Sequence, residues 1–379
     1  MKWMIKMTKG WLYIVFHYIA KRYWEKLKNN PNMGWKAEWK KFRWKRLAGS
    51  DYEKSLFPDF QDKMLSNGIE GKWKSYLMEL DFMLCRYFLG AEAEDYFSMV
   101  FPEKGWIWRN HHVTRMRMNF LKGKLNPDSE TCTLLNDKAE FCRHWGDEIH
   151  RRWCVPEEVT KKEFVAKFTG AERIITKKRI GFGGKGIVVF DVSKMSLEEI
   201  YDSIYSLPEQ YIVEEYHRQT GWLAEINPSS LNTIRVATIR VMDQIEVIFS
   251  YLRVGGKDAV VDNLHSGGIR FPINRHSGEI LPGMNYETHN IKSHPGTGSL
   301  IAGVTIPGWE NVLEYCRKAH QKAPESLHWI GWDVCLDEDD IFLIEGNAGP
   351  GFPPIENPRE NWWGEMKKYL TILEKEEKG

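Results

Sequence analysis

The sequence predicts an α+β protein whose strand-rich body is preceded by a helical, basic region. Up to residue 135, apolar residues recur every three or four positions, which is typical of amphipathic helices. From Asp137 onward, alternating apolar runs are typical of β-strands, and helical stretches interrupt them. Strands and helices do not alternate regularly, so the pattern does not indicate a doubly wound parallel sheet.

Each element can be placed in the sequence. A helix is expected where Trp73, Tyr76, Leu77, Leu80, Leu84 and Phe88 share one face, and Gly90 would end it. The expected strands are residues 172–177, 186–190, 210–215, 233–241 and 246–254, and the expected later helices are 196–207 and 309–323. We therefore divide the chain into a basic aromatic segment (1–50), a helical region (51–135) and the strand-rich body.

Composition excludes several classes of protein. A chain of 379 residues is long enough for two or three domains. With 42% hydrophobic and 28% charged residues, it is neither a disordered chain nor a membrane bundle. The net charge of +1 conceals an asymmetry, because residues 1–50 hold thirteen Lys or Arg and two Asp or Glu. The N-terminal segment is therefore cationic and the remainder is mildly acidic.

The basic N-terminal segment has two interpretations. Aromatic and apolar residues recur at helical spacing with Lys and Arg between them: Trp11, Val15, Tyr18, Ile19, Trp35, Trp39 and Phe42. Such a helix either packs its aromatic stripe on the body of the protein or lies on an anionic membrane surface. Nucleic acid is not an expected partner, because no DNA- or RNA-binding motif accompanies the charge.

Cysteine spacing and hydropathy favour a cytoplasmic protein. The six cysteines form no C-x-x-C pair and no zinc-type spacing with histidine. No run reaches the roughly eighteen apolar residues that a spanning helix requires. The stretch 11–20 is too short, and Lys21 and Arg22 follow it in place of a signal-peptide cleavage site. We expect a soluble protein, peripheral on the inner face of the membrane if residues 1–50 bind there.

A glycine-rich loop follows the expected strand that ends at Lys177. Residues 177–186 are Lys-Lys-Arg-Ile-Gly-Phe-Gly-Gly-Lys-Gly, and the next expected strand follows at once. Glycines let backbone N–H groups approach phosphate oxygens, and flanking lysines neutralise them. The loop lacks the Lys-Ser/Thr pair of a Walker A loop and the helix of a dinucleotide-binding motif. Taken alone, it is either a phosphate-binding loop or a hairpin turn.

Two apolar runs near the C-terminus carry acidic residues. The run 330–334 contains Asp333, and after the acidic turn 337–340 the run 341–344 leads into Glu345 and Asn347. Paired as a hairpin, these strands place Asp333 next to Glu345, with Asn347 on the same face. Two carboxylates and an amide oxygen are hard ligands suited to Mg²⁺. Alternatively, the turn 337–340 is simply a solvated acidic hairpin. That interpretation does not account for Glu345, whose charge directly follows an apolar run.

A phosphate-binding hairpin followed by an Asp…Glu-x-Asn hairpin resembles the ATP-grasp superfamily, over about residues 130–355. The resemblance implies an ATP-grasp fold, in which subdomains at 136–218 and 219–379 clamp ATP between antiparallel sheets. The implied ATP-binding residues are Lys138, Lys177, Gly183, Gly184, Lys185, Gly186, Glu214, Glu215 and Tyr216. The implied catalytic residues are Arg235, Arg253, Asn263, Gly267 and Gly268, and the implied magnesium ligands are Asp333, Glu345 and Asn347. The chain departs from the superfamily pattern at Lys178, where a proline usually follows the second lysine.

Four stretches resemble the sugar-transfer-associated branch of this superfamily: 227–235, 262–269, 294–298 and 330–347. This resemblance implies a role in bacterial surface-polysaccharide biosynthesis, in which an amino compound is joined to the carboxylate of a uronic acid. His265 and His294 lie within these stretches. Each would either orient substrate and accept the proton of the amine, or serve as a hydrogen-bonded structural residue.

The resemblance implies an ATP- and Mg²⁺-dependent carboxylate–amine ligase. Such ligases form an acyl phosphate from ATP and a carboxylate, and an amine then displaces the phosphate. Both steps develop negative charge, so we expect a site dense in cations, with the glycine-rich loop as a lid that excludes water. The alternatives are an ATP-grasp kinase, whose phosphate and metal residues would look the same, and a non-catalytic nucleotide-binding module that recruits partners to the membrane.

Overall fold

The computed structural model describes residues 53–68, 72–181, 186–256, 267–285, 288–338, 340–353 and 360–376. The chain divides into two compact units, Met1–Phe120 and Leu121–Gly379. The basic segment 1–50, to which the membrane prediction applies, lies outside the described residues. Within the described ranges, no helix is both long and apolar enough to cross a membrane.

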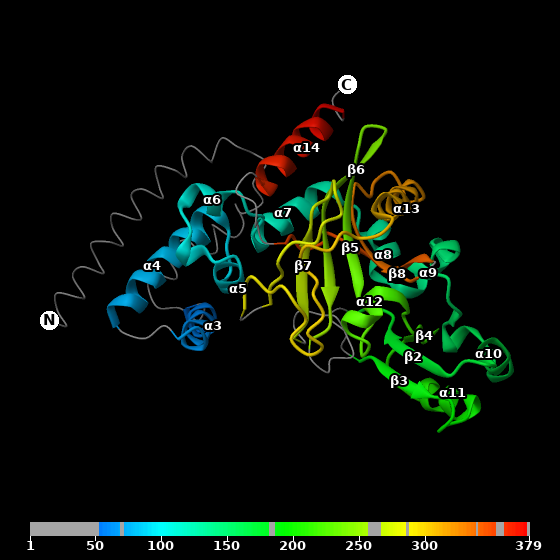
Figure 1. Ribbon diagram of the computed structural model, residues 1–379. Helices are drawn as coiled ribbons and strands as arrows, with labels where there is room; N and C mark the ends of the chain where they lie inside the picture. The colour runs from blue at the N-terminus through cyan, green and yellow to red at the C-terminus, as the bar shows by residue number, and fades with distance from the viewer. Residues whose placement is uncertain are drawn as a thin grey trace. The chain divides into compact units, whose positions relative to one another are not determined.

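The described part of the first unit is built from helices (Figure 1). They are α3 (Glu53–Ser66), α4 (Lys72–Leu89), α5 (Ala93–Ser98), η1 (Phe101–Glu103), α6 (Trp106–Asn110) and α7 (Arg115–Leu125), the last of which extends into the second unit. Helix α4 ends at the predicted place, because Gly90 adopts a left-handed φ of 67°. Stacked Phe60 and Phe82 form the centre of the core between these helices.

The second unit contains two antiparallel sheets and the helices that cover them. Its helices are α8 (Ser129–Asn136), α9 (Lys138–His144), η2 (Gly146–Glu148), η3 (Pro156–Glu158), α10 (Lys161–Phe168), α11 (Leu197–Tyr205), α12 (Gly221–Ile226), α13 (Trp309–Gln321) and α14 (Trp362–Glu376). Its strands are β1 (Trp153–Cys154), β2 (Arg173–Lys178), β3 (Val188–Asp191), β4 (Tyr211–Glu215), β5 (Thr233–Val241), β6 (Gln244–Val254), β7 (Ile269–Ile273), β8 (Trp329–Leu336) and β9 (Ile341–Ala348). The predicted α+β class is confirmed.

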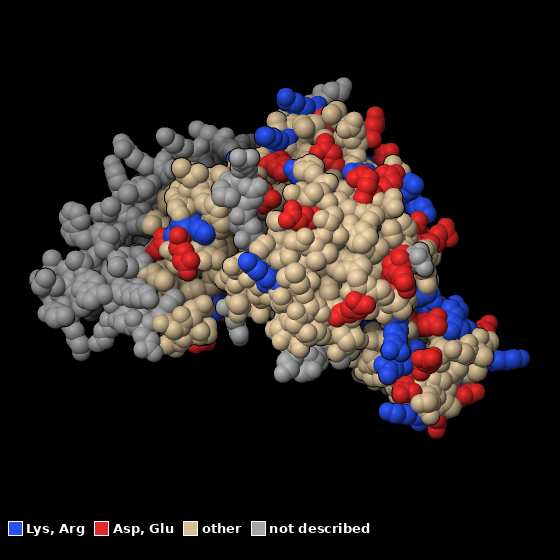
Figure 2. All heavy atoms as spheres, viewed as in Figure 1, with Lys and Arg blue, Asp and Glu red and all other residues tan. Residues whose placement is uncertain are grey.

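The smaller sheet has the strand order β1-β4-β2-β3, with every neighbouring pair antiparallel. Helices α10 and α11 pack on one face, where Ile174 and Val213 point into a core with Phe164 and Ile200. Because side chains alternate along a strand, Lys177 and Glu214 belong to the opposite face. The outer surface of this part carries closely interspersed Lys, Arg, Asp and Glu (Figure 2).

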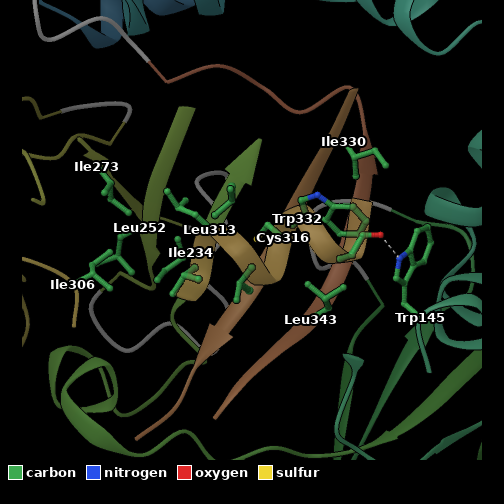
Figure 3. Close-up of a cluster of buried hydrophobic side chains, with 14 of the residues drawn as sticks. Trp145, Ile234, Leu252, Ile273, Ile306, Leu313, Cys316, Ile330, Trp332 and Leu343 are labelled. Carbon is green, nitrogen blue, oxygen red and sulfur yellow. Dashed lines mark hydrogen bonds between the residues drawn. The ribbon is translucent and has the colours of Figure 1, made fainter. Parts of the chain in front are cut away.

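The larger sheet has the order β7-β6-β5-β8-β9, also antiparallel throughout. Helix α13 lies against one face, and its Leu313 and Cys316 pack with Ile234 and Trp332 of the sheet (Figure 3). Residues that alternate with this apolar set therefore point to the other face. That second face carries the charged residues of the candidate site.

Helices α8 and α9 cover the end of β9, where Gly346 allows them to approach closely. A Cβ atom at Gly346 would lie 2.6 Å from a methyl carbon of Leu135 and 3.0 Å from the ring of Phe141. This packing places the N-terminus of α9, and with it Lys138, near the β8–β9 hairpin. Residues 121–135 thus belong to the second unit, although the sequence analysis grouped them with the helical region.

Candidate functional site

Two carboxylates lie side by side on the β8–β9 hairpin. Asp333 and Glu345 are directly opposite each other across the two strands, and a register shift follows between Asp333 and Val334. Asn347 lies two residues further along β9, opposite Gly331. Because alternate residues of a strand share a face, Asn347 points the same way as Glu345. The structure therefore gathers the three residues of the expected metal set.

Two arginines neutralise Asp333, which is 1% exposed. Arg235 on β5 is its register neighbour and donates to both carboxylate oxygens, with an Nη2–Oδ2 distance of 2.8 Å. Arg253 on β6 donates to Oδ2 of the same carboxylate. Burial by itself raises the pKa of Asp333, but the two guanidinium charges outweigh it and hold that pKa below its ordinary range. Asp333 is therefore ionised at neutral pH.

A glycine makes room for this ion pair. A Cβ atom at Gly331 would lie 2.4 Å from Cβ of Pro350 and 3.3 Å from Cδ of Arg235. Contacts shorter than 3 Å do not occur between real carbon atoms, so a larger residue at 331 would force the neighbouring chain to move. Glycine at this position lets the Arg235 side chain lie along β8 and reach Asp333.

Glu345 is in a different environment, because the ionised Asp333 lies beside it. Burial and the Asp333 charge raise the pKa of Glu345, while the charges of Lys138 and Arg253 oppose that change. The two carboxyl groups share a hydrogen bond. A bound divalent cation would compensate the negative charge of both carboxylates.

The amide of Asn347 is a buried polar group in need of a partner. Its Nδ2 atom makes no hydrogen bond within the described residues, although buried polar atoms are normally paired. Nδ2 is a hydrogen-bond donor and does not bind cations, whereas Oδ1 of the same amide can. Two carboxylates and this amide oxygen are a set that fits Mg²⁺, because this ion takes few protein ligands. The described part of the chain contains no cluster of three His, Cys, Asp or Glu residues that could hold a metal.

Lys138 lies between the glycine-rich loop and the carboxylates. It is the first residue of α9, whose N-cap Asp137 accepts hydrogen bonds from the N–H groups of residues 139 and 140. The Lys138 ammonium donates to the carbonyl of Gly181 at 2.9 Å. Its charge also lowers the pKa of Glu345. Lys138 is thus near both the entry to the loop and the metal set.

Lys177 is held by a buried carboxylate on the smaller sheet. Its ammonium donates to Oε2 of Glu214 at 2.7 Å, and Nε of Arg151 donates to the same oxygen at 2.8 Å. Burial by itself raises the pKa of Glu214, but the charges of Arg151 and Lys177 outweigh it and lower that pKa to about 2. The side chain of Glu214 is 3% exposed, so this ion-pair cluster lies in the interior.

Arg151 joins the two sheets, and its role was not found from the sequence. Besides Glu214, its guanidinium donates to the carbonyls of Leu343 at 2.7 Å and Ile344 at 3.0 Å, both on β9. The next residue along β9 is Glu345. In the sequence, Arg151 stands beside Arg152 just before a short apolar segment. This position does not indicate a contact with β9.

The buried thiol of Cys142 indicates how closely the cations gather. Burial raises the pKa of Cys142 to about 12, and four charged groups act on it: Glu214, Arg151, Lys177 and Lys138. The backbone N–H of Lys138 donates to the carbonyl of Arg179, two residues after Lys177, at 3.0 Å, so α9 and the end of β2 are neighbours. Arg151, which shares Glu214 with Lys177, donates to the strand that carries Glu345.

The next two residues of the expected hinge strand pair with groups outside this cluster. Glu215 pairs with Arg152 on the opposite face of β4, with an Nη2–Oε1 distance of 2.6 Å. The ring of Tyr216 lies under the guanidinium of Arg173 at 5.8 Å. The backbone N–H groups of Glu215 and Tyr216 donate to the carbonyls of residues 152 and 173. In this conformation neither N–H group is available to a nucleotide.

The structure describes three of the five glycines expected in the site. Gly186 has a left-handed φ of 77°, and its Cβ position lies 2.8 Å from Cε of Lys178. Gly267 also has a left-handed φ, of 82°, and Gly268 is buried just before β7. The remaining glycine-loop and late-loop residues of the expected site lie outside the described residues: Gly183, Gly184, Lys185 and Asn263.

A family model described as sugar-transfer associated ATP-grasp matches residues 118–359. The chain belongs to the sugar-transfer-associated ATP-grasp family. The match covers both sheets and every residue of the site described above, so the ATP-grasp fold expected from the sequence is confirmed.

Solved structures with some similarity to this ATP-grasp protein include three enzymes. Carboxyaminoimidazole ribonucleotide synthase from Aspergillus clavatus, complexed with ATP, has 13% identity and a TM-score of 0.38, and the match covers 62% of this chain and 48% of that one. D-alanyl-alanine synthetase A from Vibrio cholerae has 12% identity and a TM-score of 0.37, with 64% of this chain and 63% of that one covered. L-amino acid ligase from Bacillus licheniformis has 10% identity and a TM-score of 0.38, with 69% of this chain and 54% of that one covered. The chain thus spans about half to under two thirds of their lengths. No curated protein matches the sequence.

In this ATP-grasp protein, three of the stretches characteristic of the branch meet around Gly255 and Gly256. Nδ1 of His294 accepts from the N–H of Thr297 at 3.1 Å, so Nε2 donates to the carbonyl of Gly255 at 2.9 Å. Nδ2 of Asn227 donates to the carbonyl of Gly256 at 3.4 Å. Buried and hydrogen-bonded through both nitrogens, His294 fits the structural role. His265 lies outside the described residues.

Proposed function

We propose that this chain is an ATP- and Mg²⁺-dependent ligase that activates a carboxylate as an acyl phosphate and joins it to an amine. The observation that carries the proposal is the connection of Lys177 to β9. The cation of the smaller sheet and the carboxylates of the larger sheet are linked through Glu214 and Arg151. A triphosphate needs such a site, with cations on one side and metal-binding carboxylates on the other.

Each charged group has a role in this reaction. Lys138 and Lys177 would bind the phosphates of ATP. Asp333, Glu345 and Asn347 would hold Mg²⁺, which when bound neutralises phosphate oxygens and orients them. Holding these groups in place before substrate binds lowers the barrier, because they need no reorganisation during the reaction.

Transfer of the γ-phosphoryl group follows from this arrangement. The substrate carboxylate attacks the γ-phosphorus of ATP, the bond to the bridging oxygen breaks, and ADP leaves with those electrons. The amine then attacks the carbonyl carbon of the acyl phosphate, and inorganic phosphate leaves as the amine loses a proton. In this proposal Arg253 and Arg235, which both donate to Asp333, stabilise the negative charge that develops on the transferred phosphoryl and carbonyl oxygens.

The carboxylate in this proposal is that of a sugar (uronic) acid, and the pathway is surface-polysaccharide biosynthesis. The description of the family as associated with sugar transfer supports this assignment. The amine co-substrate is an amino compound. The sequence contains no Ser-His-Asp set in a recognisable motif, so no covalent enzyme intermediate enters the proposal.

One assay tests the proposal against the kinase and the non-catalytic alternatives. ADP release is measured with uronic acids and amino acids, with and without hydroxylamine, which traps acyl phosphates as hydroxamates. A ligase forms hydroxamate only when the acid is present. A phosphorylated product without hydroxamate would indicate a kinase, and nucleotide binding without turnover would indicate a binding module.

A further inference from the structure

Arg270 places a third guanidinium on the charged face of the larger sheet. It lies on β7, directly opposite Arg253 in the antiparallel β6–β7 pair. Its neighbours Ile269 and Phe271 are buried in the core on the α13 side. Because side chains alternate along a strand, Arg270 points to the same face as Arg253 and Asp333.

The charge of Arg270 is not balanced by a carboxylate in the described part of the chain. Arg235 and Arg253 both pair with Asp333. The described contact of the Arg270 guanidinium is with the face of the Tyr251 ring, at 5.3 Å from its centroid, and Arg235 lies 6.0 Å from the same centroid. Arginine stays protonated in proteins, and like charges directly opposite across a sheet repel each other. Among the residues that the structure describes, Arg270 therefore adds a positive charge to this end of the site that no carboxylate balances.

The backbone of Arg270 is held by pairing with its neighbour, and its guanidinium lies over an aromatic ring. Its backbone N–H and carbonyl both pair with Met284, at 2.9 and 2.8 Å. The ring beneath its guanidinium belongs to Tyr251, which is 1% exposed. The side chain of Arg270 itself is half-buried. A planar guanidinium that is half-buried and lies over an aromatic ring suits a carboxylate or phosphate bound through two parallel hydrogen bonds.

The position of Arg270 separates it from the phosphate-binding groups. Strands β7 and β8 are three places apart in the sheet, or roughly 14 Å at the usual spacing. The guanidinium groups of Arg270 and of Arg235, which pairs with Asp333, lie 5.3 and 6.0 Å from the centroid of the same Tyr251 ring, so one small molecule can reach from Arg270 to Asp333. The non-reacting end of a co-substrate would lie at Arg270 if its reacting end meets the phosphates.

We infer that Arg270 is a specificity-determining residue that binds a non-reacting carboxylate or phosphate group of a co-substrate. This inference rests on the proposed ligase function. It adds a requirement that the function alone does not make: either the acid or the amine carries a second anionic group. The group lies on the β7 side of Tyr251, away from the reacting atoms.

The test compares matched substrates in the wild type, Arg270→Met and Arg270→Lys. The two acids are glucuronate, with one carboxylate, and glucarate, with two. The two amines are alanine, which has a carboxylate, and alaninamide, which has an amide in its place. In one of the two pairs, the wild type should favour the more anionic compound in kcat/KM by about tenfold to a hundredfold. Arg270→Met should abolish this preference and Arg270→Lys should keep part of it, with KM for ATP unchanged. The pair that responds identifies the co-substrate.

Controls separate this inference from the proposed function. Arg317→Met removes an arginine from α13, on the opposite face of the sheet, and should leave every preference intact. Absence of ADP release from the wild type with every acid would count against the ligase itself. In that case, thermal stabilisation by glucarate in the presence of Mg·ADP is compared between the wild type and Arg270→Met. No preference in the wild type, a preference that survives Arg270→Met, or equal stabilisation of both proteins would overturn the assignment of Arg270.

Discussion

Asp333 and Glu345 face each other across β8 and β9, and their carboxyl groups share a hydrogen bond although their pKa values move in opposite directions. The difference arises from their neighbours. Asp333 accepts hydrogen bonds from Arg235 and Arg253, which outweigh its burial. Burial raises the pKa of Glu345, and the neighbouring negative charge of Asp333 raises it further. The pair is a site built for a cation that both carboxylates can share.

Substitution Glu345→Gln tests the metal assignment. Glutamine can still donate a hydrogen bond to Asp333, so the protein should unfold at the wild-type temperature. The loss of one negative charge from the metal set should reduce Mg²⁺-dependent ADP release by about a hundredfold. Sustained ADP production at the wild-type rate would remove Glu345 from the magnesium site.

Arg253→Ala tests whether that arginine stabilises developing charge. Arg235 still neutralises Asp333 in this variant, so nucleotide binding should change little. Loss of a donor to the transferred group should lower kcat by about 10²-fold to 10³-fold. The matched control is Arg317→Ala on α13, which removes an arginine from the other face of the sheet. An effect on KM for ATP alone would contradict the transition-state role.

Glu214→Gln tests the ion-pair cluster that anchors Lys177. Removal of one partner leaves the buried charges of Arg151 and Lys177 without compensation, so unfolding free energy should fall by about 3 to 5 kcal/mol at neutral pH. Glu198→Gln, on the exposed side of α11, should cost little. Urea unfolding followed by fluorescence measures both.

The same residue gives stability a predictable dependence on pH. The pKa of Glu214 is about 2 in the folded protein, below its ordinary value of 4.5. Its carboxylate therefore stabilises the fold fully above pH 4.5, and this contribution is lost as the pH falls toward 2. The wild type should lose more stability across this window than Glu214→Gln does. Parallel curves for the two proteins would show that the cluster does not contribute.

Gly256→Ala tests the close approach of Gly256 to Gly267. The added Cβ would lie 2.4 Å from the carbonyl oxygen of Gly267, so we expect a loss of about 1 to 3 kcal/mol. Gly123→Ala in α7 is the control, because its Cβ position is open. That change should be neutral or stabilising by up to about 1 kcal/mol. Equal stability of the two variants would contradict the packing at Gly256.

The sequence predicted the elements whose patterns are local. Strand β5 has the predicted bounds, and the β8–β9 hairpin follows from two apolar runs around an acidic turn. The pairing of Asp333 with Glu345 could be predicted for the same reason, since a hairpin brings residues on either side of its turn together. Strand β7 was missed because it is short and contains Pro272, which weakens a strand pattern.

The residues that sequence reasoning missed act through tertiary contacts. Arg151 precedes β1 in the smaller sheet, yet its partners include two carbonyls of β9, almost two hundred residues later. Arg270 is significant only because β7 pairs with β6 in the register that puts it opposite Arg253. Neither contact leaves a periodic pattern in the sequence, because both depend on how distant strands are ordered in a sheet.

The proposal requires that one nucleotide is bound by Lys177 directly and by Glu345 through Mg²⁺. A crystal structure of the protein with Mg²⁺ and a non-hydrolysable ATP analogue tests it most directly. In that complex we expect a metal ion about 2.1 Å from a carboxylate oxygen of Glu345 and a phosphate oxygen about 2.8 Å from the Lys177 ammonium. A nucleotide bound with its phosphates away from both residues would contradict it.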